Sequence, residues 1–317
     1  MAGELTSEVP SPRISVCVPS VRADTIGDTI AALLKQTFEA WELVVVVQGD
    51  TPELDAVVRA AAERDARVRS IRTARRGASH ARNAGVAAAR ADVVAFTDDD
   101  CEPTPTWLAA IDAALAADPT VGVVAGVLEA PPGVEGAMTF CPSVAQRDVT
   151  FRPTPEDREL PAGTGFASAN VAIRRWAWEA VGPFDEALGP GAEFPSSEDL
   201  DLWIRIAHAG VPIRFASDAV VLHTHGARTG WRAVLRMSTA YAAGQGAVAA
   251  KLELGGGDTS WRRAMWDQCI LTPAKSLRLH QIPARLPRLV AFERARLRCK
   301  RSFTLDERGL LQRRDPA

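Results

Sequence analysis

The sequence lacks paired cysteines, and it lacks any apolar run long enough to cross a bilayer. Its five cysteines are scattered and form no CxxC pair, which argues against a disulfide framework or a zinc site and fits a reducing cytoplasm. No stretch of about 18 apolar residues occurs, so we expect no helix that spans a membrane. Residues 1–13 are polar and contain Pro10 and Pro12, so we expect a disordered tail there and not a signal peptide.

Charge is distributed unevenly along the 317 residues, although the formal net charge is only −2. Residues 1–225 carry 19 Lys and Arg against 32 Asp and Glu, whereas residues 226–317 carry 18 against 7. A basic tail on an acidic body indicates that the tail meets something anionic: a phospholipid surface, a lipid-phosphate acceptor or the body itself. A solvated helical face is the simpler alternative, and nucleic acid is not an expected partner.

Short apolar runs alternate with helical patterns in the first half of the chain. Such alternation predicts an α/β fold with a mostly parallel sheet and right-handed crossovers, in one large domain or one with a smaller appendage. The predicted strands are 14–18, 43–47, 68–71, 93–96 and 121–127. The predicted helices begin near Ile26 and cover 53–64, 78–90 and 107–117.

The second half of the chain shows a long proline-rich stretch and then more order. Residues 129–162 lack periodicity and predict a long surface loop, of the kind that often forms a lid. Residues 197–208 predict a helix with a serine cap and an acidic first turn, and 220–222 predict a short strand. Residues 231–253 predict a helix that Gly244 and Gly246 interrupt, and a basic helical tail follows.

Three consecutive aspartates, Asp98, Asp99 and Asp100, follow the strand at 93–96. Carboxylates this close repel one another unless a cation offsets them, and their oxygens suit Mg²⁺ or Mn²⁺. Pro19 and residues 48–50 also follow strands, and ligands of parallel sheets gather at such strand ends. The sequence therefore predicts a cation and nucleotide site at this edge, with a solvated acidic turn as the alternative.

Several motifs in residues 14–225 occur in an order that resembles the family 2 glycosyltransferases, which have the GT-A fold. The matching pieces are 14–20, 42–50, the segment with Gly77, Ala81, Arg82, Asn83 and Gly85, then 98–100, 105–108, 170–186, Glu198 with Asp199, and His223. The resemblance implies a Rossmann-like, mostly parallel mixed sheet flanked by helices. It divides the chain into a nucleotide-sugar half (14–127), an acceptor half (128–225) and a C-terminal helical extension (226–317).

The resemblance also implies roles at the donor site. Asp100 is the expected direct metal ligand, Asp98 contacts the ribose or the metal through water, and Asp99 binds the donor or only shapes the turn. Arg82 is expected to reach the diphosphate, with an exposed surface arginine as the alternative. The remaining donor-binding candidates are Pro19, Ser20, Gln48 and Asp50.

The sequence departs from the family pattern where the second strand ends. The family usually has two acidic residues there, whereas this chain has Val47 and Gln48, with Asp50 two residues later. An amide both donates and accepts, so Gln48 could bond the amide edge of a pyrimidine. The departure leaves the identity of the base open.

Asp199 is the expected general base that activates the acceptor hydroxyl, with Glu198 orienting the acceptor. A helix N-terminus favours an ionised carboxylate, which would leave Asp199 ready to accept a proton at neutral pH. The alternative is that these acids only complement the helix dipole. Asp201 lies about 200° further around the helix and cannot share the face of Asp199.

His223 is expected either to complete the metal shell, where imidazole suits Mn²⁺ better than Mg²⁺, or to be a core histidine beside His225. His80, His208 and His280 belong to no constellation and are expected to be structural. Cys101 follows the aspartates, whose charges raise the pKa of its thiol, so we expect no nucleophilic role for it.

Together these features predict a cytoplasmic, metal-dependent, inverting glycosyltransferase that uses a nucleotide-diphospho-sugar. We expect UDP or dTDP as the carrier before GDP. The expected acceptor is a surface glycan in polysaccharide biosynthesis, a lipid-linked intermediate or a secondary metabolite, and the basic tail suggests peripheral membrane contact. The alternatives are a nucleotidyltransferase that makes a sugar nucleotide and a catalytically inactive nucleotide-sugar-binding module.

Overall fold

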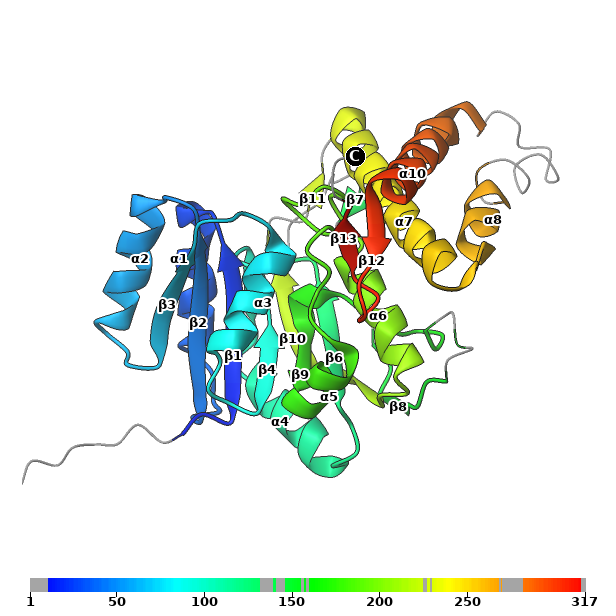
Figure 1. Cartoon of the computed structure of the whole chain (residues 1–317). Coiled ribbons are helices and arrows are strands. Elements are labelled where there is room, and N and C mark those ends of the chain that lie inside the picture. Colours follow the sequence, from blue (N-terminus) through cyan, green and yellow to red (C-terminus); the bar gives the residue numbers. More distant parts are fainter. Residues whose placement is uncertain are drawn as a thin grey trace, which may run out of the picture.

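The computed structural model (Figure 1) shows a central sheet with helices on both faces and a helical C-terminal region beside one end of it. It describes residues 11–131, 139–140, 146–154, 157, 160–224, 227–228, 230–267, 269 and 282–314, with the backbone alone at 139–140, 227–228, 261 and 282–284. The predicted disordered tail lies outside the described residues except for 11–13.

The main sheet contains nine strands within the described residues and is mostly parallel, as predicted. Eight strands follow the order β3-β2-β1-β4-β9-β6-β10-β5, and β8 pairs with β10. Strands β9, β5 and β8 run antiparallel to their neighbours. The strands are β1 (Ile14–Ser20), β2 (Trp41–Gln48), β3 (Val68–Thr73), β4 (Val93–Phe96), β5 (Cys101–Pro103), β6 (Val123–Glu129), β8 (Val149–Phe151), β9 (Val171–Arg174) and β10 (Ile213–His223).

Continuous apolar runs form these strands because both faces of the sheet are covered. All eight residues of β2 are buried, and successive side chains enter two different cores. One core is closed by α1 (Ala23–Leu33), α2 (Pro52–Ala62) and α4 (Trp107–Ala117). The other is closed by α3 (Ala78–Ala88), α5 (Arg175–Val181) and α6 (Glu198–His208). The local periodicities therefore predicted these layers correctly.

The prediction of a loop throughout 129–162 is wrong, because this stretch contributes strands. Strand β8 joins the main sheet, and β7 (Thr139–Phe140) pairs with β11 (Ala227–Arg228). These pairings depend on partners more than 60 residues away, which local patterns do not reveal. The strand predicted at 220–222 is the end of the longer β10, whose register shifts between Ala216 and Val220.

Helix α7 (Trp231–Gly256) is continuous, so the predicted interruption at Gly244 and Gly246 is wrong. Glycine weakens a helix by about 1 kcal/mol relative to alanine, but it lets another backbone come close. A Cβ atom at Gly244 would lie 2.4 Å from the carbonyl oxygen of Ser196, and one at Gly246 would lie 2.2 Å from that of Phe292. The two glycines are thus packing sites on both sides of α7.

Gly246→Ala is expected to lower the free energy of unfolding by at least about 2 kcal/mol, because the added methyl group meets backbone that cannot rotate away. Denaturation in urea measures the loss. Gly256→Ala, in the same helix with nothing within 4 Å of the added atom, is the matched control and should be neutral or slightly stabilising. Equal stability of the two variants would contradict the close packing of α7.

The C-terminal region continues with α8 (Ser260–Trp266), α10 (Ile282–Ser302) and a hairpin of β12 (Phe303–Leu305) and β13 (Leu311–Arg313). Figure 1 shows α10 lying along α7, and the hairpin reaches the loop before α6. Arg298 and Arg313 both pair with Glu193 of that loop. Part of the basic charge of the tail therefore meets the acidic body, one of the three partners expected from the sequence. None of the described helices is both long and apolar enough to cross a membrane.

Candidate active site

A cleft of about 1200 Å³ opens at the carboxyl ends of the strands and gathers most of the predicted site residues. Those that line it are Pro19, Gln48, Arg82, Asp98, Asp99, Asp100, Glu198, Asp199 and His223. Ser20 does not line the cleft, but its hydroxyl donates to Asp99 Oδ2 (2.7 Å). Asp50 is exposed and lies outside the cleft lining, so its predicted donor contact has no support in the geometry.

His223 is brought to the aspartates by backbone pairing. Strand β5 begins directly after Asp100 and runs antiparallel to β10, with Cys101 opposite His223. The amide of Thr224 donates to the carbonyl of Asp100 (3.0 Å), and His223 Nε2 lies 3.4 Å from Asp100 Oδ1. His223 therefore lies beside the carboxylates, its role as a metal ligand stays a prediction, and His225 lies outside the described residues.

Asp100, Cys101 and His223 have ligand atoms within 4.8 Å of one another. Burial opposes ionisation of Asp100, but the hydrogen bond from His223 and the charge of Arg22 outweigh it and hold the pKa of Asp100 well below its usual range. Burial, with Asp98 and Asp100 adding to it, raises the pKa of the Cys101 thiol, which stays protonated. An ionised carboxylate and an imidazole suit a divalent cation such as Mn²⁺, whereas a neutral thiol does not.

Arg22 is a site residue that the sequence reasoning missed. Its guanidinium pairs with Asp99 and lies 3.0 Å from Asp100 Oδ2, so it offsets part of the repulsion within the aspartate trio. The one feature of the sequence that could have indicated Arg22 is its position two residues after Ser20, in the motif at 14–20. The bonds of Asp99 to Ser20 and Arg22 fit a residue that shapes this turn.

Arg82 is 2% exposed, so the alternative of a surface arginine is wrong. Its Nη2 donates to Asp98 Oδ1 (2.7 Å), and its Nη1 donates to Glu198 Oε1 (3.2 Å). Asp98 turns to Arg82 and is not part of the Asp100–His223 group. The buried guanidinium thus links the aspartate side of the cleft to the start of α6.

Glu198 and Asp199 occupy the first turn of α6, after Ser197, which has a left-handed φ of 72°. The predicted serine cap is wrong, because Ser197 makes no side-chain capping bond. Burial raises the pKa of Glu198 to about 7, with the charge of Asp199 adding to it. Burial also raises the pKa of Asp199 and outweighs the bond from the Leu200 amide (2.8 Å), so this pKa is not lowered as the position at a helix N-terminus suggested.

Comparison with known proteins points to one family. Residues 15–162 match the family model "Glycosyl transferase family 2". This match places residues 15–162 in that family. A "Pre-mycofactocin glycosyltransferase" of Mycobacterium tuberculosis is 33% identical over 156 residues, which cover 47% of this chain and 30% of that protein. A "Glucosyl-dolichyl phosphate glucuronosyltransferase" of Haloferax volcanii is 27% identical over 195 residues, covering 61% and 62%. Both matches span less than two thirds of the relative's own length.

Solved structures share the GT-A fold of this chain. The mannosyltransferase PcManGT of Pyrobaculum calidifontis, in complex with GDP-Man and Mn²⁺, matches with a TM-score of 0.56 at 23% identity, covering 91% of this chain and 76% of that one. TarS 1–349 of S. aureus, in complex with UDP, matches with a TM-score of 0.53 at 16% identity, covering 95% and 96%. The predicted fold class is confirmed.

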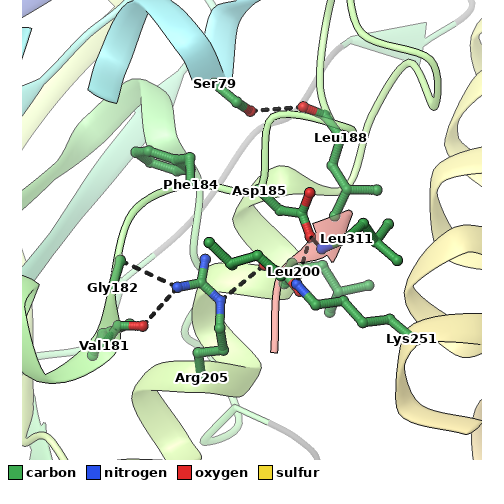
Figure 2. A network of polar contacts seen from close by, with 12 residues as sticks. Ser79, Val181, Gly182, Phe184, Asp185, Leu188, Leu200, Arg205, Lys251 and Leu311 are labelled. Atoms are coloured by element: carbon green, nitrogen blue, oxygen red, sulfur yellow. Dashed lines mark hydrogen bonds and ion pairs between the residues drawn. The ribbon is translucent and has the colours of Figure 1, made fainter. Parts of the chain in front are cut away.

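A buried ionic network ties α6 to the C-terminal region (Figure 2). Lys251 of α7 reaches Asp201 Oδ1 at 2.6 Å and Asp185 Oδ2 at 2.7 Å. Arg205 donates to Asp201 Oδ2 (2.9 Å), and the amide of Leu311 in the hairpin donates to Asp185 Oδ2 (2.9 Å). Asp201 therefore faces away from the cleft, as its helical position predicts.

Gln48 has a fixed orientation at the end of β2. Its Oε1 accepts a hydrogen bond from the amide of Gly77 (2.8 Å), and a backbone N–H can only donate. The NH₂ group therefore remains as the polar group that Gln48 can offer to the cleft. The sequence suggested that Gln48 both donates to and accepts from a base, whereas this geometry favours donation.

Proposed function

We propose that this protein transfers a sugar from a nucleotide-diphospho-sugar to an acceptor hydroxyl, with inversion at the anomeric carbon. The observation that carries the proposal is a single cleft that holds a candidate cation pair, Asp100 with His223, and a carboxylate pair, the buried Glu198 with the half-buried Asp199. Such a cleft can bind an activated sugar beside a base that removes a proton from the attacking hydroxyl.

The donor is proposed to lie along the ends of β1, β2 and β4. Pro19, Gln48, Asp98 and Asp99 line this part of the cleft, and the NH₂ group of Gln48 can donate to a carbonyl of the base. The structural neighbours were solved with GDP-Man or with UDP, which supports a nucleotide sugar without deciding the base. We propose UDP or dTDP as the carrier.

Asp100 and His223 are the residues proposed to hold a divalent cation, Mn²⁺ or Mg²⁺. The depressed pKa of Asp100 keeps this carboxylate ionised, which a hard cation requires. When bound, the cation would stabilise negative charge on the departing nucleoside diphosphate. Arg22 holds the aspartate turn in place through Asp99.

Asp199 is proposed as the general base. Its raised pKa makes the ionised form a stronger proton acceptor than an ordinary aspartate. Asp98 and Glu198 are both paired with Arg82, so neither is poised to attack the sugar as a covalent nucleophile. A single displacement by the activated hydroxyl inverts the anomeric centre.

The acceptor is proposed to be a lipid-linked intermediate, a surface glycan or a secondary metabolite. One relative is named for a dolichyl phosphate sugar and another for pre-mycofactocin, which supports more than one acceptor class. Contact of the basic tail with a membrane from the cytoplasmic side stays a prediction.

A thermal-shift series with UDP, dTDP and GDP, each with Mn²⁺ or with a chelator, tests the proposal. A nucleotide at 100 times its Kd should add about 2.7 kcal/mol of stability, which raises the Tm by several degrees. We expect this shift for at least one nucleotide, and we expect chelation or Asp100→Asn to remove it. Failure of all three nucleotides with Mn²⁺ would overturn the proposal, and pyrophosphate release from a nucleoside triphosphate and a sugar phosphate would favour the nucleotidyltransferase.

A further inference from the structure

The cleft has two unlike sides, set by the strand order. The proposed donor residues follow β2, β1 and β4, which are neighbours in the sheet. The other side is formed by the end of β6, the segment before β9 and helix α7. There the lining is largely apolar: Leu128, Phe166, Ala167, Ala233, Met237 and Ala240.

One face of α7 supplies half of this apolar wall. Ala233, Met237 and Ala240 recur at spacings of four and three residues, which places them on one stripe of the helix. Nothing in the core of the domain requires this stripe, since it faces the cleft and its residues stay partly exposed.

Helix α7 is held directly against the turn that carries the proposed base. The Ser196 hydroxyl donates to the carbonyl of Ala240 (3.0 Å), and Gly244 lets the helix approach the Ser196 backbone. Ser196 is three residues before Asp199, so the apolar wall borders the position where the acceptor hydroxyl must lie. The residues proposed to bind the donor and its cation lie on the other side of the cleft, so the apolar wall is available to the acceptor.

A positively charged side chain, Arg236, lies on the same face of α7. Arg236 lines the cleft, is exposed, and its guanidinium has no hydrogen bond or ion pair with the described residues. Of the other arginines that line the cleft, Arg22 and Arg82 are paired with carboxylates, and Arg76 lies on the donor side, next to Gly49. An apolar trough beside an unpaired guanidinium matches a molecule with an apolar chain and an anionic group.

We infer that α7 forms the acceptor subsite and that it takes an amphiphilic acceptor of the lipid-phosphate type. The alkyl chain packs on Met237 and Ala240 against Phe166, and the phosphate pairs with Arg236. This inference rests on the proposed function and names the acceptor class for the same cleft.

Binding of octyl phosphate to the protein saturated with UDP and Mn²⁺ tests the inference by calorimetry. Affinity should rise about two- to fourfold for each methylene from butyl to octyl phosphate, because each added group leaves water. Met237→Glu should weaken octyl phosphate at least about tenfold, and Arg236→Gln should weaken octyl phosphate but not the neutral octyl glucoside. Ser238→Glu, which adds the same charge one residue away from the lining, is the matched control and should bind as the wild type does.

The affinity for UDP with Mn²⁺ is measured on each variant and should stay unchanged. If the affinity for alkyl phosphates does not depend on chain length, or if Met237→Glu does not weaken it, the inference of an acceptor subsite on α7 is overturned. If Arg236→Gln loses affinity for UDP but keeps its affinity for octyl phosphate, Arg236 serves the donor. That result overturns the inference that Arg236 binds the phosphate of the acceptor. Absence of UDP binding in the wild type is a failure of the proposed function, and it is seen before any alkyl phosphate is added.

Discussion

Asp199→Asn is expected to lower the turnover for sugar transfer by about 10²–10⁴-fold, the usual range for removing a general base. Asparagine keeps the size of the side chain and can still accept the Leu200 amide bond, but it cannot take up a proton. The affinity for the nucleotide with Mn²⁺ should not change, because Asp199 is not among the residues that hold either. Turnover and nucleotide affinity are measured on the same preparation.

The pH profile separates loss of the base from a general disturbance of the site. Burial raises the pKa of Asp199, so in the wild type the acid limb of kcat/KM should lie above the ordinary aspartate value of about 3.9. In Asp199→Asn, the pH profile of the remaining activity should no longer show the acid limb that Asp199 causes. Asp218→Asn, at an exposed position of β10, is the control and should match the wild type. Undiminished turnover in Asp199→Asn would mean that another group is the base.

Lys251→Met is expected to lower the free energy of unfolding by about 3–5 kcal/mol, which is typical when one partner of a buried ion pair is removed. Methionine keeps the length of the chain but leaves Asp185 and Asp201 buried, 1% and 3% exposed, with fewer positive partners. Lys300→Met is the matched control. Lys300 is 40% exposed and pairs with Glu253, so its loss should cost about 1 kcal/mol or less.

The cost of Lys251→Met should depend on pH. Burial disfavours the ionised form of Asp201, but Lys251 and Arg205 outweigh it and lower the pKa of Asp201. A carboxyl group whose pKa is lowered in the folded state stabilises the protein at pH values above about 3.9. This stabilisation is lost as the pH falls through the folded-state pKa. Without Lys251 the pKa of Asp201 should rise, so the difference from the wild type should be largest near pH 7 and shrink as the pH falls through the higher pKa that Asp201 has in the variant. A difference that does not vary with pH would contradict a charge-based role for Lys251.

The network at Lys251 also shows why the C-terminal region matters to the site. Lys251 joins α7 to Asp201, which is two residues after Asp199 on α6. The hairpin amide of Leu311 holds the other carboxylate of the network, Asp185. The C-terminal region therefore supports the helix that carries the proposed base, in addition to lining the cleft.

Local patterns were enough for most of the first half of the fold. The apolar run of β2 predicted a strand buried on both faces because every one of its side chains must avoid water, whichever face it points to. The same reasoning placed Asp98, Asp99 and Asp100 at the cleft edge, since carboxyl ends of parallel strands meet at one side of a sheet.

Positions that depend on distant partners could not be predicted in this way. Gly244 and Gly246 look like helix breakers in the sequence, but they become packing sites once Ser196 and Phe292 lie against them. Arg22 was missed because its partners, Asp99 and Asp100, are almost 80 residues away. Asp50 follows a strand as the site residues do, but its side chain lies outside the cleft lining.

The sequence by itself determined the alternating layers, the carboxylates at the strand ends and the motif order of a family 2 glycosyltransferase. Periodic burial and strand direction are local properties, so they can be read from neighbouring residues. Only the tertiary structure decided that His223 meets Asp100, that Arg82 is buried between Asp98 and Glu198, and that α7 closes the cleft. Each of these contacts joins residues far apart in the chain, and whether a charged side chain is exposed or paired depends on what the fold places beside it.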